Sequence, residues 1–490
     1  MTIWFGKRRL PSCLKGTDSV KKDFNKLARA LPAVDKVLKL PEAIRLTKIC
    51  GKDAVVESVR NTLNALRSSI LKSERVETRL CEASAVLEQA AKEIERDSRP
   101  CLKRVVNATG IILHTGLGRA MLPEAAKEEL SRVAGYCNLQ QDLQTGQRDR
   151  REECVREIVR GLTGAEDVLV VNNNAGATFL LLTALASGKE VVISRGELIE
   201  IGGSFRLPDI MKASGAILRE VGTTNKTHLK DYANAVGPKT AMILKAHKSN
   251  YKIVGFTKEV GIGEIAQVGK KHGVPAVDDL GCGALVGLEQ FGLDHEYTVR
   301  ESLQAGADLV LFSTDKLIGG PQGGMIVGRA GLIERIRSHP LYRILRVCKL
   351  TLGALEATLR LFKAPDLLAK KHPVYMMMAK TPAAMKSQAL QLKIEIGRKR
   401  PDWELAISKE VSYLGGGSLP GAEMPSFALR AKAPHMRADE MARQFRMSAT
   451  PIIPRVADDC VILDMRTVFP EDIPDILQAV EHIMSGGKDK

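Results

Sequence analysis

Short apolar runs recur through the middle of this chain, and an amphipathic stretch or a glycine-rich turn separates each run from the next. Runs of roughly four to eight residues without helical periodicity are typical of buried strands. The predicted strands cover 167–171, 190–194, 216–221, 241–246, 274–278, 308–312 and 325–327. Strands that alternate with helices favour a mostly parallel sheet covered on both faces, so the pattern predicts an α/β fold.

The pattern is different before and after this region. From Leu31 to about Arg99 apolar residues recur at helical spacing and glycine is absent after Gly51, which predicts helices ending in a long one over 73–97. Helical stretches over 341–369 and on to about Arg398, then strand-like runs at 427–433 and 452–468, predict a small α+β domain. The predicted domains are a basic helical N-terminal domain (1–75), a linker helix (76–100), a large domain (101–365) and a small C-terminal domain (366–490).

Charge adds information about partners. The 490 residues carry a formal net charge of +16, and residues 1–100, with 21 Lys and Arg against 13 Asp and Glu, supply half of it. Such an excess favours a polyanionic partner, nucleic acid before membrane, although a solubilising surface explains it equally well. Aromatic residues make up only 4% of the chain, so no RNA-binding motif with interleaved aromatics decides between the two readings.

Cysteine usage and hydropathy argue against a disulfide-rich, zinc-binding, membrane or secreted protein. The nine cysteines are scattered and form no C-x-x-C pair, which argues against disulfides and a zinc site, and we expect no metal. Cys282, in a glycine-rich turn, is a candidate reactive thiol. No apolar run reaches the roughly 18 residues of a membrane span, and the apolar start is too short for a secretory signal. We therefore expect a cytoplasmic protein without a membrane partner.

Lys316 is the first residue with candidate chemistry. It follows the predicted strand 308–312 and precedes the glycine-rich run LIGGPQGG (317–324). Ligands of α/β enzymes bind at the carboxyl edge of the sheet, and burial there lowers the pKa of an amine and frees its lone pair to form an imine. A lysine without catalytic function at the end of a strand would have the same sequence pattern, so the residues at neighbouring strand ends must distinguish the two interpretations.

Two neighbouring strand ends supply that context. Asp278 and Asp279 end the strand 274–278, and a pyridoxal phosphate (PLP) enzyme needs one carboxylate against the pyridine nitrogen of its cofactor. Strand alternation allows only one of the pair to face the pocket. The run VVNNNAGA (170–177) leads from a strand into an apolar helix, and backbone N–H groups at such a helix start bind phosphate. Phosphate loop, carboxylate and lysine on successive strands together predict a PLP site.

At these positions the sequence resembles a known family. The motifs are NATGIILHTGLGRA (107–120), SRGELIEIGGSFRLP (194–208), VGTTNKT (221–227), HKSNY (247–251), DLG (279–281) and STDKLIGGPQ (313–322). They are similar to those of the bacterial L-seryl-tRNA(Sec) selenium transferases, or selenocysteine synthases, over about residues 30–468. These are PLP enzymes of the aspartate-aminotransferase-like fold (fold type I), which is the fold that the resemblance implies here.

The resemblance also implies roles for individual residues. Lys316 matches the Schiff-base lysine, Asp315 the acidic residue before it, and Asp279, preferred over Asp278, the partner of the pyridine nitrogen. The other implied cofactor-binding residues are Asn174, Ala175, Gly176, His247 and Ser313. Arg119, Arg343 and Arg346 match arginines that line the family's active site, where guanidinium groups suit the selenophosphate dianion. Without the resemblance, Arg343 and Arg346 would read as one solvated helix face.

The reaction implied is PLP-dependent β-elimination of water from seryl-tRNA(Sec), then addition of selenium from selenophosphate, in a homo-oligomer built from dimers. One alternative is a PLP-dependent lyase of the same superfamily acting on a free small amino acid. Another is a catalytically idle RNA-binding protein with this fold. The basic first hundred residues argue against the lyase, and the intact Lys316, Asp279 and phosphate loop argue against the idle protein.

Overall fold

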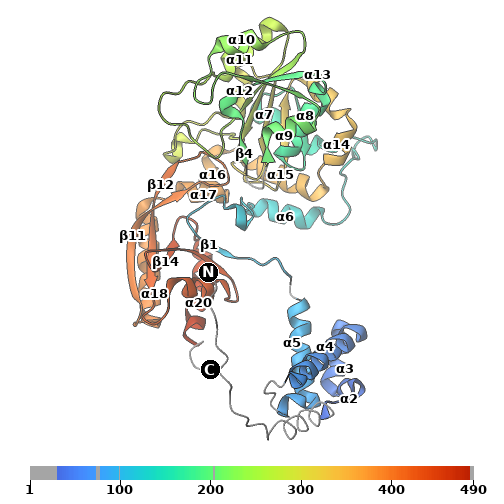
Figure 1. Cartoon of the computed structure of the whole chain (residues 1–490), viewed down its shortest axis with the longest axis vertical. Coiled ribbons are helices and arrows are strands. Elements are labelled where there is room, and N and C mark those ends of the chain that lie inside the picture. The colour runs from blue at the N-terminus through green and yellow to red at the C-terminus, as the bar shows by residue number, and fades with distance from the viewer. Residues whose placement is uncertain (1–29, 73–77, 99, 202–204, 486–490) are drawn as a thin grey trace, which may run out of the picture. The chain divides into compact units, whose positions relative to one another are not determined.

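The computed structural model describes residues 30–72, 78–98, 100–201 and 205–485. By its internal contacts the chain divides into two compact units, 1–103 and 104–490, and each is described by itself (Figure 1). No helix among the described residues is both long enough and apolar enough to cross a membrane.

All regular elements in the described part of the first unit are helical. Its elements are α2 (Val34–Leu38), α3 (Pro41–Cys50), α4 (Lys52–Leu71), the 3₁₀ turn η1 (Thr78–Cys81) and α5 (Ala83–Ser98). Small and branched side chains from α2, α3, α4 and α5 form its core, among them Val37, Val59 and Val86.

Of the long helix expected over 73–97, residues 83–97 are confirmed as part of α5, whereas residues 78–81 form the 3₁₀ turn η1 instead. The preceding 3₁₀ turn buries Cys81, and this tertiary burial overrides the helical propensity of the segment. Residues 73–77, and with them the expected domain boundary at 75, lie outside the described residues. So do residues 1–29, which hold eight of the 21 basic residues of the first hundred and only two of its 13 acidic residues.

A seven-stranded sheet forms the centre of the second unit. Its strands are β2 (Asp167–Val171), β3 (Glu190–Ser194), β6 (Ile217–Val221), β7 (Thr240–Ala246), β8 (Ala276–Gly281), β9 (Leu309–Ser313) and β10 (Gly324–Gly328), in the order β2-β10-β9-β8-β7-β3-β6. β10 runs antiparallel to both of its neighbours, and the other pairs are parallel. All seven strands predicted from apolar runs are confirmed.

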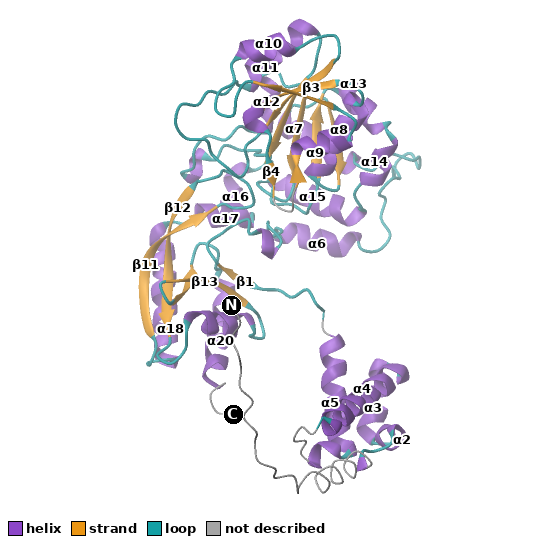
Figure 2. Ribbon diagram, in the orientation of Figure 1, coloured by secondary structure: helices purple, strands orange, loops and turns teal. Residues whose placement is uncertain are grey.

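Helices cover both faces of this sheet (Figure 2). They are α7 (Glu153–Thr163), α8 (Asn174–Ala186), α9 (Leu207–Ala213), α10 (Leu229–Ala235), α11 (Ile262–His272), α12 (Val299–Gln304) and α13 (Ala330–Arg337), while α6 (Glu124–Val133) packs against the later helix α15 (Lys349–Leu361). Successive strand residues enter two separate cores: in β2, Val168 and Val170 join one, while Leu169 and Val171 join the other. This alternation decides which face each polar side chain at a strand end occupies.

The stretch predicted as helical over 341–369 is divided into several pieces. They are α14 (Pro340–Leu345), α15 (Lys349–Leu361), the 3₁₀ turn η5 (Pro365–Leu367) and α16 (Leu368–Lys371), followed by α17 (Pro373–Ala379) and α18 (Pro382–Lys399). Prolines stand at the first positions of α14, α17 and α18, where the missing N–H costs nothing, and this placement explains why new helices begin there.

A second, five-stranded sheet has the order β1-β13-β14-β12-β11. Its strands are β1 (Val106–Ala108), β11 (Glu404–Tyr413), β12 (Glu423–Lys432), β13 (Ile452–Ala457) and β14 (Cys460–Asp464), and α19 (Ala438–Arg446) and α20 (Ile473–Ser485) complete this region. The strand-like runs at 427–433 and 452–468 correspond to β12, β13 and β14, whereas β1 and β11 were not predicted. β11 is an edge strand whose residues are mostly half-buried or exposed, so it has no apolar run.

Candidate active site

The carboxyl ends of β7, β8 and β9 surround a cavity of about 240 Å³ in the second unit. Parallel strands bring their carboxyl ends to one edge, which is why residues far apart in the sequence meet there. Eight residues predicted from the sequence line it: Arg119, Asn174, Ala175, His247, Asp279, Ser313, Asp315 and Lys316. The structure therefore brings together most of the predicted site, and Gly176, Arg343 and Arg346 lie outside its lining.

Lys316 lies in the turn between β9 and β10 and is only 6% exposed. Burial lowers the pKa of its amine, and the nearby cation of Arg119 lowers the same pKa further. The turn is fixed from behind by α17 and the residue before it: Tyr375 donates a hydrogen bond to the Leu317 carbonyl at 3.0 Å. His372 lies 2.8 Å from the Ile318 carbonyl through its Nε2. A buried lysine on a fixed turn has the properties of an amine nucleophile.

The turn after Lys316 requires a glycine at position 319. Its φ is +65°, and a Cβ atom there would come within 2.1 Å of the His372 ring. Any other residue would displace the histidine that supports the turn.

Asp279 and Asp278 point to opposite faces of β8. Asp279 accepts hydrogen bonds from Asn174 Nδ2 at 2.8 Å and from Thr178 Oγ1 at 3.0 Å, both on α8. Burial raises the pKa of Asp279 above its usual range. Asp278 accepts from Ser302 Oγ at 2.6 Å on the opposite side, where burial raises its pKa to about 6. Strand alternation thus places Asp279, and not Asp278, in the cavity with Lys316.

The start of α8 faces the same cavity. Asn173 caps the helix by accepting the Gly176 N–H at 2.7 Å, so this glycine's amide is already used. The first N–H groups of a helix have no acceptor within it, and Asn174 and Ala175 hold such groups at the cavity wall. Helix N-termini of this kind bind phosphate.

Two further pairs hold charged groups at the cavity. Arg119 Nη1 donates to Asp315 Oδ2 at 2.9 Å, and the Arg119 side chain is one-third exposed while that of Asp315 is nearly buried. His247 Nε2 lies 3.4 Å from Glu296 Oε1, and burial lowers the pKa of His247. The His247 Nδ1 atom is buried and has no hydrogen-bond partner among the described residues.

Other predicted residues lie elsewhere. Arg343 is exposed on α14, and Arg346, directly after that helix, lines a different cavity together with Arg148, Arg150 and Arg337. Cys282 is fully buried and donates to Glu296 through its sulfur at 3.3 Å, and burial raises the pKa of its thiol. The expectation of a reactive thiol at Cys282 is therefore wrong, because the thiolate is disfavoured and inaccessible. Among the described residues no cluster of His, Cys, Asp and Glu is arranged to hold a metal ion.

Comparison with known proteins identifies the family. Residues 105–469 match the family model described as L-seryl-tRNA selenium transferase, and residues 28–67 match that of the selenocysteine synthase N terminus. The chain belongs to the L-seryl-tRNA selenium transferase family. It is 42% identical over 464 residues to the L-seryl-tRNA(Sec) selenium transferase of Carboxydothermus hydrogenoformans, which covers 94% of this chain and 99% of that protein. It is 44% identical over 455 residues to that of Geobacter metallireducens, covering 92% and 98%.

A solved structure supports the fold. D-Glucosaminate-6-phosphate ammonia-lyase superimposes with a TM-score of 0.54 at 19% identity, covering 79% of this chain and 97% of that one. The family resemblance and the aspartate-aminotransferase-like fold expected from the sequence are thus confirmed, and with them the PLP cofactor.

The cavity of this selenium transferase fits PLP by the chemistry of its lining. The amides of Asn174 and Ala175 can receive a phosphate, and Asp279 offers a carboxylate to the ring nitrogen. Lys316 offers an amine, and the unpartnered His247 Nδ1 and Asn174 Oδ1 atoms leave polar groups available to a ligand. The individual contacts stay predictions.

Two residues that support this site, Thr178 and Glu296, were not predicted from the sequence. Thr178 and Asn174 both donate hydrogen bonds to Asp279. Thr178 lies four residues after Asn174 and therefore on the same face of α8, and this spacing could have identified it from the sequence. Glu296, which approaches both His247 and Cys282, lies in a loop without periodicity, and no sequence signal identified it.

Proposed function

We propose that this chain converts seryl-tRNA(Sec) to selenocysteinyl-tRNA(Sec), with selenophosphate as the selenium donor. The observation that carries the proposal is the cavity in which the buried Lys316 shares a wall with Asp279 and the start of α8, in a chain of this family. When bound, PLP supplies an electron sink that makes loss of the α-proton and then of the β-hydroxyl possible.

The chain's own residues supply proton transfer and positioning. Because burial and Arg119 lower the pKa of Lys316, a larger fraction of its amine is neutral and can accept the α-proton at Nζ. To Asp315, which Arg119 contacts and which precedes Lys316 in the sequence, we assign the role of tuning this amine or protonating the leaving hydroxyl. The cavity lining includes the buried apolar side chains of Ile199 and Leu207, which offer no hydrogen bond to water.

We further propose a homo-oligomer built from dimers, working in the cytoplasm where charged tRNA is available. The positions of Arg343 and Arg346 support this: neither lines the Lys316 cavity of its own chain, so a second copy is a natural source for them. There, planar guanidinium groups would bind the selenophosphate dianion through paired hydrogen bonds.

The test is product analysis with purified enzyme, PLP and selenophosphate. Labelled seryl-tRNA(Sec) should yield selenocysteine on the tRNA, whereas seryl-tRNA(Ser) and free L-serine should not react. Release of pyruvate or ammonia from free serine at a comparable rate would favour the small-molecule lyase instead.

A further inference from the structure

The cavity that Arg346 lines has a volume of about 500 Å³ and an unusual share of cations. The chain between α6 and α7 contributes part of its lining, and α13, α14 and the residue after α14 contribute the rest. We call it the arginine cavity. Its arginines are Arg148, Arg150, Arg151, Arg337 and Arg346, and its lining also includes the carboxylates of Asp149 and Glu152.

Acidic side chains neutralise two of these arginines. Arg337 Nε lies 3.1 Å from Glu152 Oε1, and Arg337 Nη1 lies 3.0 Å from Asp167 Oδ2. Arg150 Nη1 lies 3.6 Å from the same oxygen of Asp167. The positive charge of Arg337 and Arg150 is therefore already used within the protein.

The other three arginines have no carboxylate partner among the described residues. The side chains of Arg148 and Arg346 form no hydrogen bond or ion pair with any described residue, although Arg346 is half-buried. Arg151 donates to the Val347 carbonyl at 3.2 Å and to Gln140 Oε1 at 3.3 Å, and its Nε is buried without a partner. Removing a cation from water without a counter-charge is costly, so this arrangement favours a bound anion.

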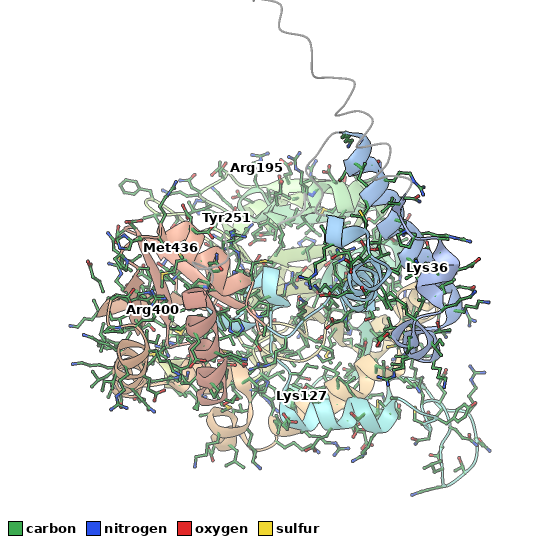
Figure 3. All side chains as sticks on the ribbon, turned by 90° about the horizontal axis from the view of Figure 1, so that it is seen from below. Lys36, Lys127, Arg195, Tyr251, Arg400 and Met436 are labelled. Atoms are coloured by element: carbon green, nitrogen blue, oxygen red, sulfur yellow. The ribbon has the colours of Figure 1, made fainter. Side chains whose placement is uncertain are left out.

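Backbone hydrogen bonds fix the position of Arg148. The Asp149 N–H donates to the Gln140 carbonyl at 3.1 Å, and Gln141 and Arg148 form an antiparallel bridge. Figure 3 shows the chain that follows the helix of Lys127 projecting from the second unit. Arg148 is thus held at the arginine cavity by an ordered loop.

Arg346 connects the arginine cavity with the strand that leads into α8. Its backbone bridges the last residue of β2, and the Asn172 N–H donates to the Leu345 carbonyl at 2.9 Å. Two residues later Asn174 begins α8 and lines the Lys316 cavity. Both cavities therefore lie at the same edge of the central sheet.

The reaction offers two phosphate-type dianions for such a site. One is the phosphate of the cofactor, for which the Lys316 cavity already offers the amides of Asn174 and Ala175. The other is the inorganic selenium donor. A tetrahedral dianion suits guanidinium groups without a counter-charge, because each can donate two parallel hydrogen bonds to its oxygens. The inorganic dianion is therefore the better match for the arginine cavity.

Building on the proposed function, we propose that Arg148 and Arg151 form, together with Arg346, the site that binds the inorganic dianion of the selenium donor. Arg148 has all of its N–H donors free for this ligand, whereas Arg151 uses two of its donors to hold the loop. The three arginines belong to one chain, so a second copy that supplies Arg346 to a Lys316 cavity brings Arg148 and Arg151 with it.

The test is the binding of inorganic phosphate, a stable dianion of the same shape, to the full chain loaded with PLP. Arg148→Gln removes a side chain that contacts no described partner, so the fold should be retained. Phosphate affinity, measured by calorimetry, should fall roughly ten- to hundred-fold, the value of a charge-assisted paired contact, and the KM for selenophosphate should rise by a similar factor. Arg148→Lys keeps the charge without the paired donors and should give a smaller loss.

Arg446→Gln is the matched control. Arg446 is an exposed arginine of α19 whose side chain also has no described partner, so this change removes the same charge away from the arginine cavity. It should bind phosphate as the wild type does, and all three variants should bind PLP normally.

Three results would overturn the proposal. The first is unchanged phosphate affinity in Arg148→Gln, and the second is an equal loss in Arg446→Gln, which would reduce the effect to net charge. The third is a loss of PLP affinity with phosphate affinity retained, which would assign Arg148 to the cofactor. Wild-type turnover of seryl-tRNA(Sec) is measured in parallel, because its absence would refute the proposed function, whereas normal turnover with any of these results refutes only the role of Arg148.

Discussion

Arg119 Nη1 lies 2.9 Å from Asp315 Oδ2, which joins a loop residue to the residue directly before Lys316 across 196 positions of sequence. Arg119 has a φ of +65°, a left-handed conformation that is uncommon for residues other than glycine. Its backbone is therefore held in an unfavoured conformation that places the guanidinium group over the cavity, where it contacts Asp315 and lowers the pKa of Lys316.

Removal of this cation should change the titration of the lysine. In Arg119→Gln the pKa of Lys316 should rise, because the cation that disfavours protonation is gone. The rate at which added PLP becomes covalently attached, trapped with borohydride at a series of pH values, should then reach its half-maximum at a higher pH than in the wild type. Arg195→Gln, which removes an arginine paired with Glu220 outside this cavity, is the control and should leave the profile unchanged. An identical profile for Arg119→Gln would mean that Arg119 does not tune the lysine.

Asp278 and Asp279 offer a matched pair for testing the cofactor contact. Asp279→Asn loses the negative charge in the cavity, so PLP affinity should fall roughly ten- to hundred-fold, the value of a charge-assisted hydrogen bond. Asp278→Asn, on the other face of β8, should bind PLP as the wild type does. Equilibrium dialysis of both variants measures the difference, and the reverse order of effects would assign the contact to Asp278.

Asp278→Asn should also change the pH dependence of stability. In the folded state burial raises the pKa of Asp278 to about 6, from an ordinary 3.8. The folded state therefore binds the carboxyl proton of Asp278 more tightly than the unfolded state does. Protonated Asp278 stabilises the fold below about pH 4, and this stabilisation is lost as the pH rises through 6. The variant should gain stability relative to the wild type over that interval, by up to about 3 kcal/mol. Urea unfolding at pH 4.5 and pH 7.5 tests this, and a constant difference between the two proteins would contradict it.

Glu296 should act through His247 rather than directly on a ligand. Glu296→Gln weakens the contact at His247 Nε2, so PLP affinity should fall roughly two- to ten-fold, the range of one hydrogen bond. The pH dependence of the bound-cofactor absorbance should shift as well, because the Glu296 carboxylate raises the pKa of His247. Glu289→Gln is a close control, since Glu289 pairs with the exposed His295 outside the cavity. Equal effects of the two substitutions would argue for a general loss of stability.

The origin of Arg343 can be tested by complementation. If a second copy supplies this arginine, Lys316→Ala and Arg343→Ala should each be inactive but recover activity when their subunits are mixed. Random pairing into dimers leaves about a quarter of the sites intact, so the rate should approach a quarter of the wild-type rate. No recovery, with mixed oligomers demonstrated by differential tagging, would contradict a contribution from a second copy.

Arg343→Lys should weaken selenophosphate use roughly ten- to hundred-fold, because a lysine keeps the charge but cannot form the paired contact.

Most of the central sheet could be predicted because strands such as β2, β3 and β9 are buried and apolar on both faces, and each appears in the sequence as an isolated run, whereas the edge strand β6 is mostly exposed. Asp279 could be found because it lies close to the carboxyl end of β8, and Lys316 because it lies in the turn directly after β9. The edge strand β11 has no such run, since Lys409 and Glu410 lie in its middle. Glu296 belongs to a loop that is positioned by tertiary contacts alone, and no local pattern specifies the direction in which its side chain points. Arg343 and Arg346 were assigned to the site by resemblance alone. A resemblance in sequence does not say whether a residue contributes to the cavity of its own chain or to that of a second copy.

The first strand of the smaller sheet comes from the opposite end of the second unit. Val106 in β1 pairs with Ile452 in β13, and the Gly110 N–H donates to Thr467 Oγ across 357 residues. During synthesis β1 leaves the ribosome long before β13 exists, and the large domain can collapse while β1 still lacks its neighbour. The order of synthesis therefore makes closure of this sheet a late event, and until then the nascent protein carries an open strand edge that invites pairing with other chains.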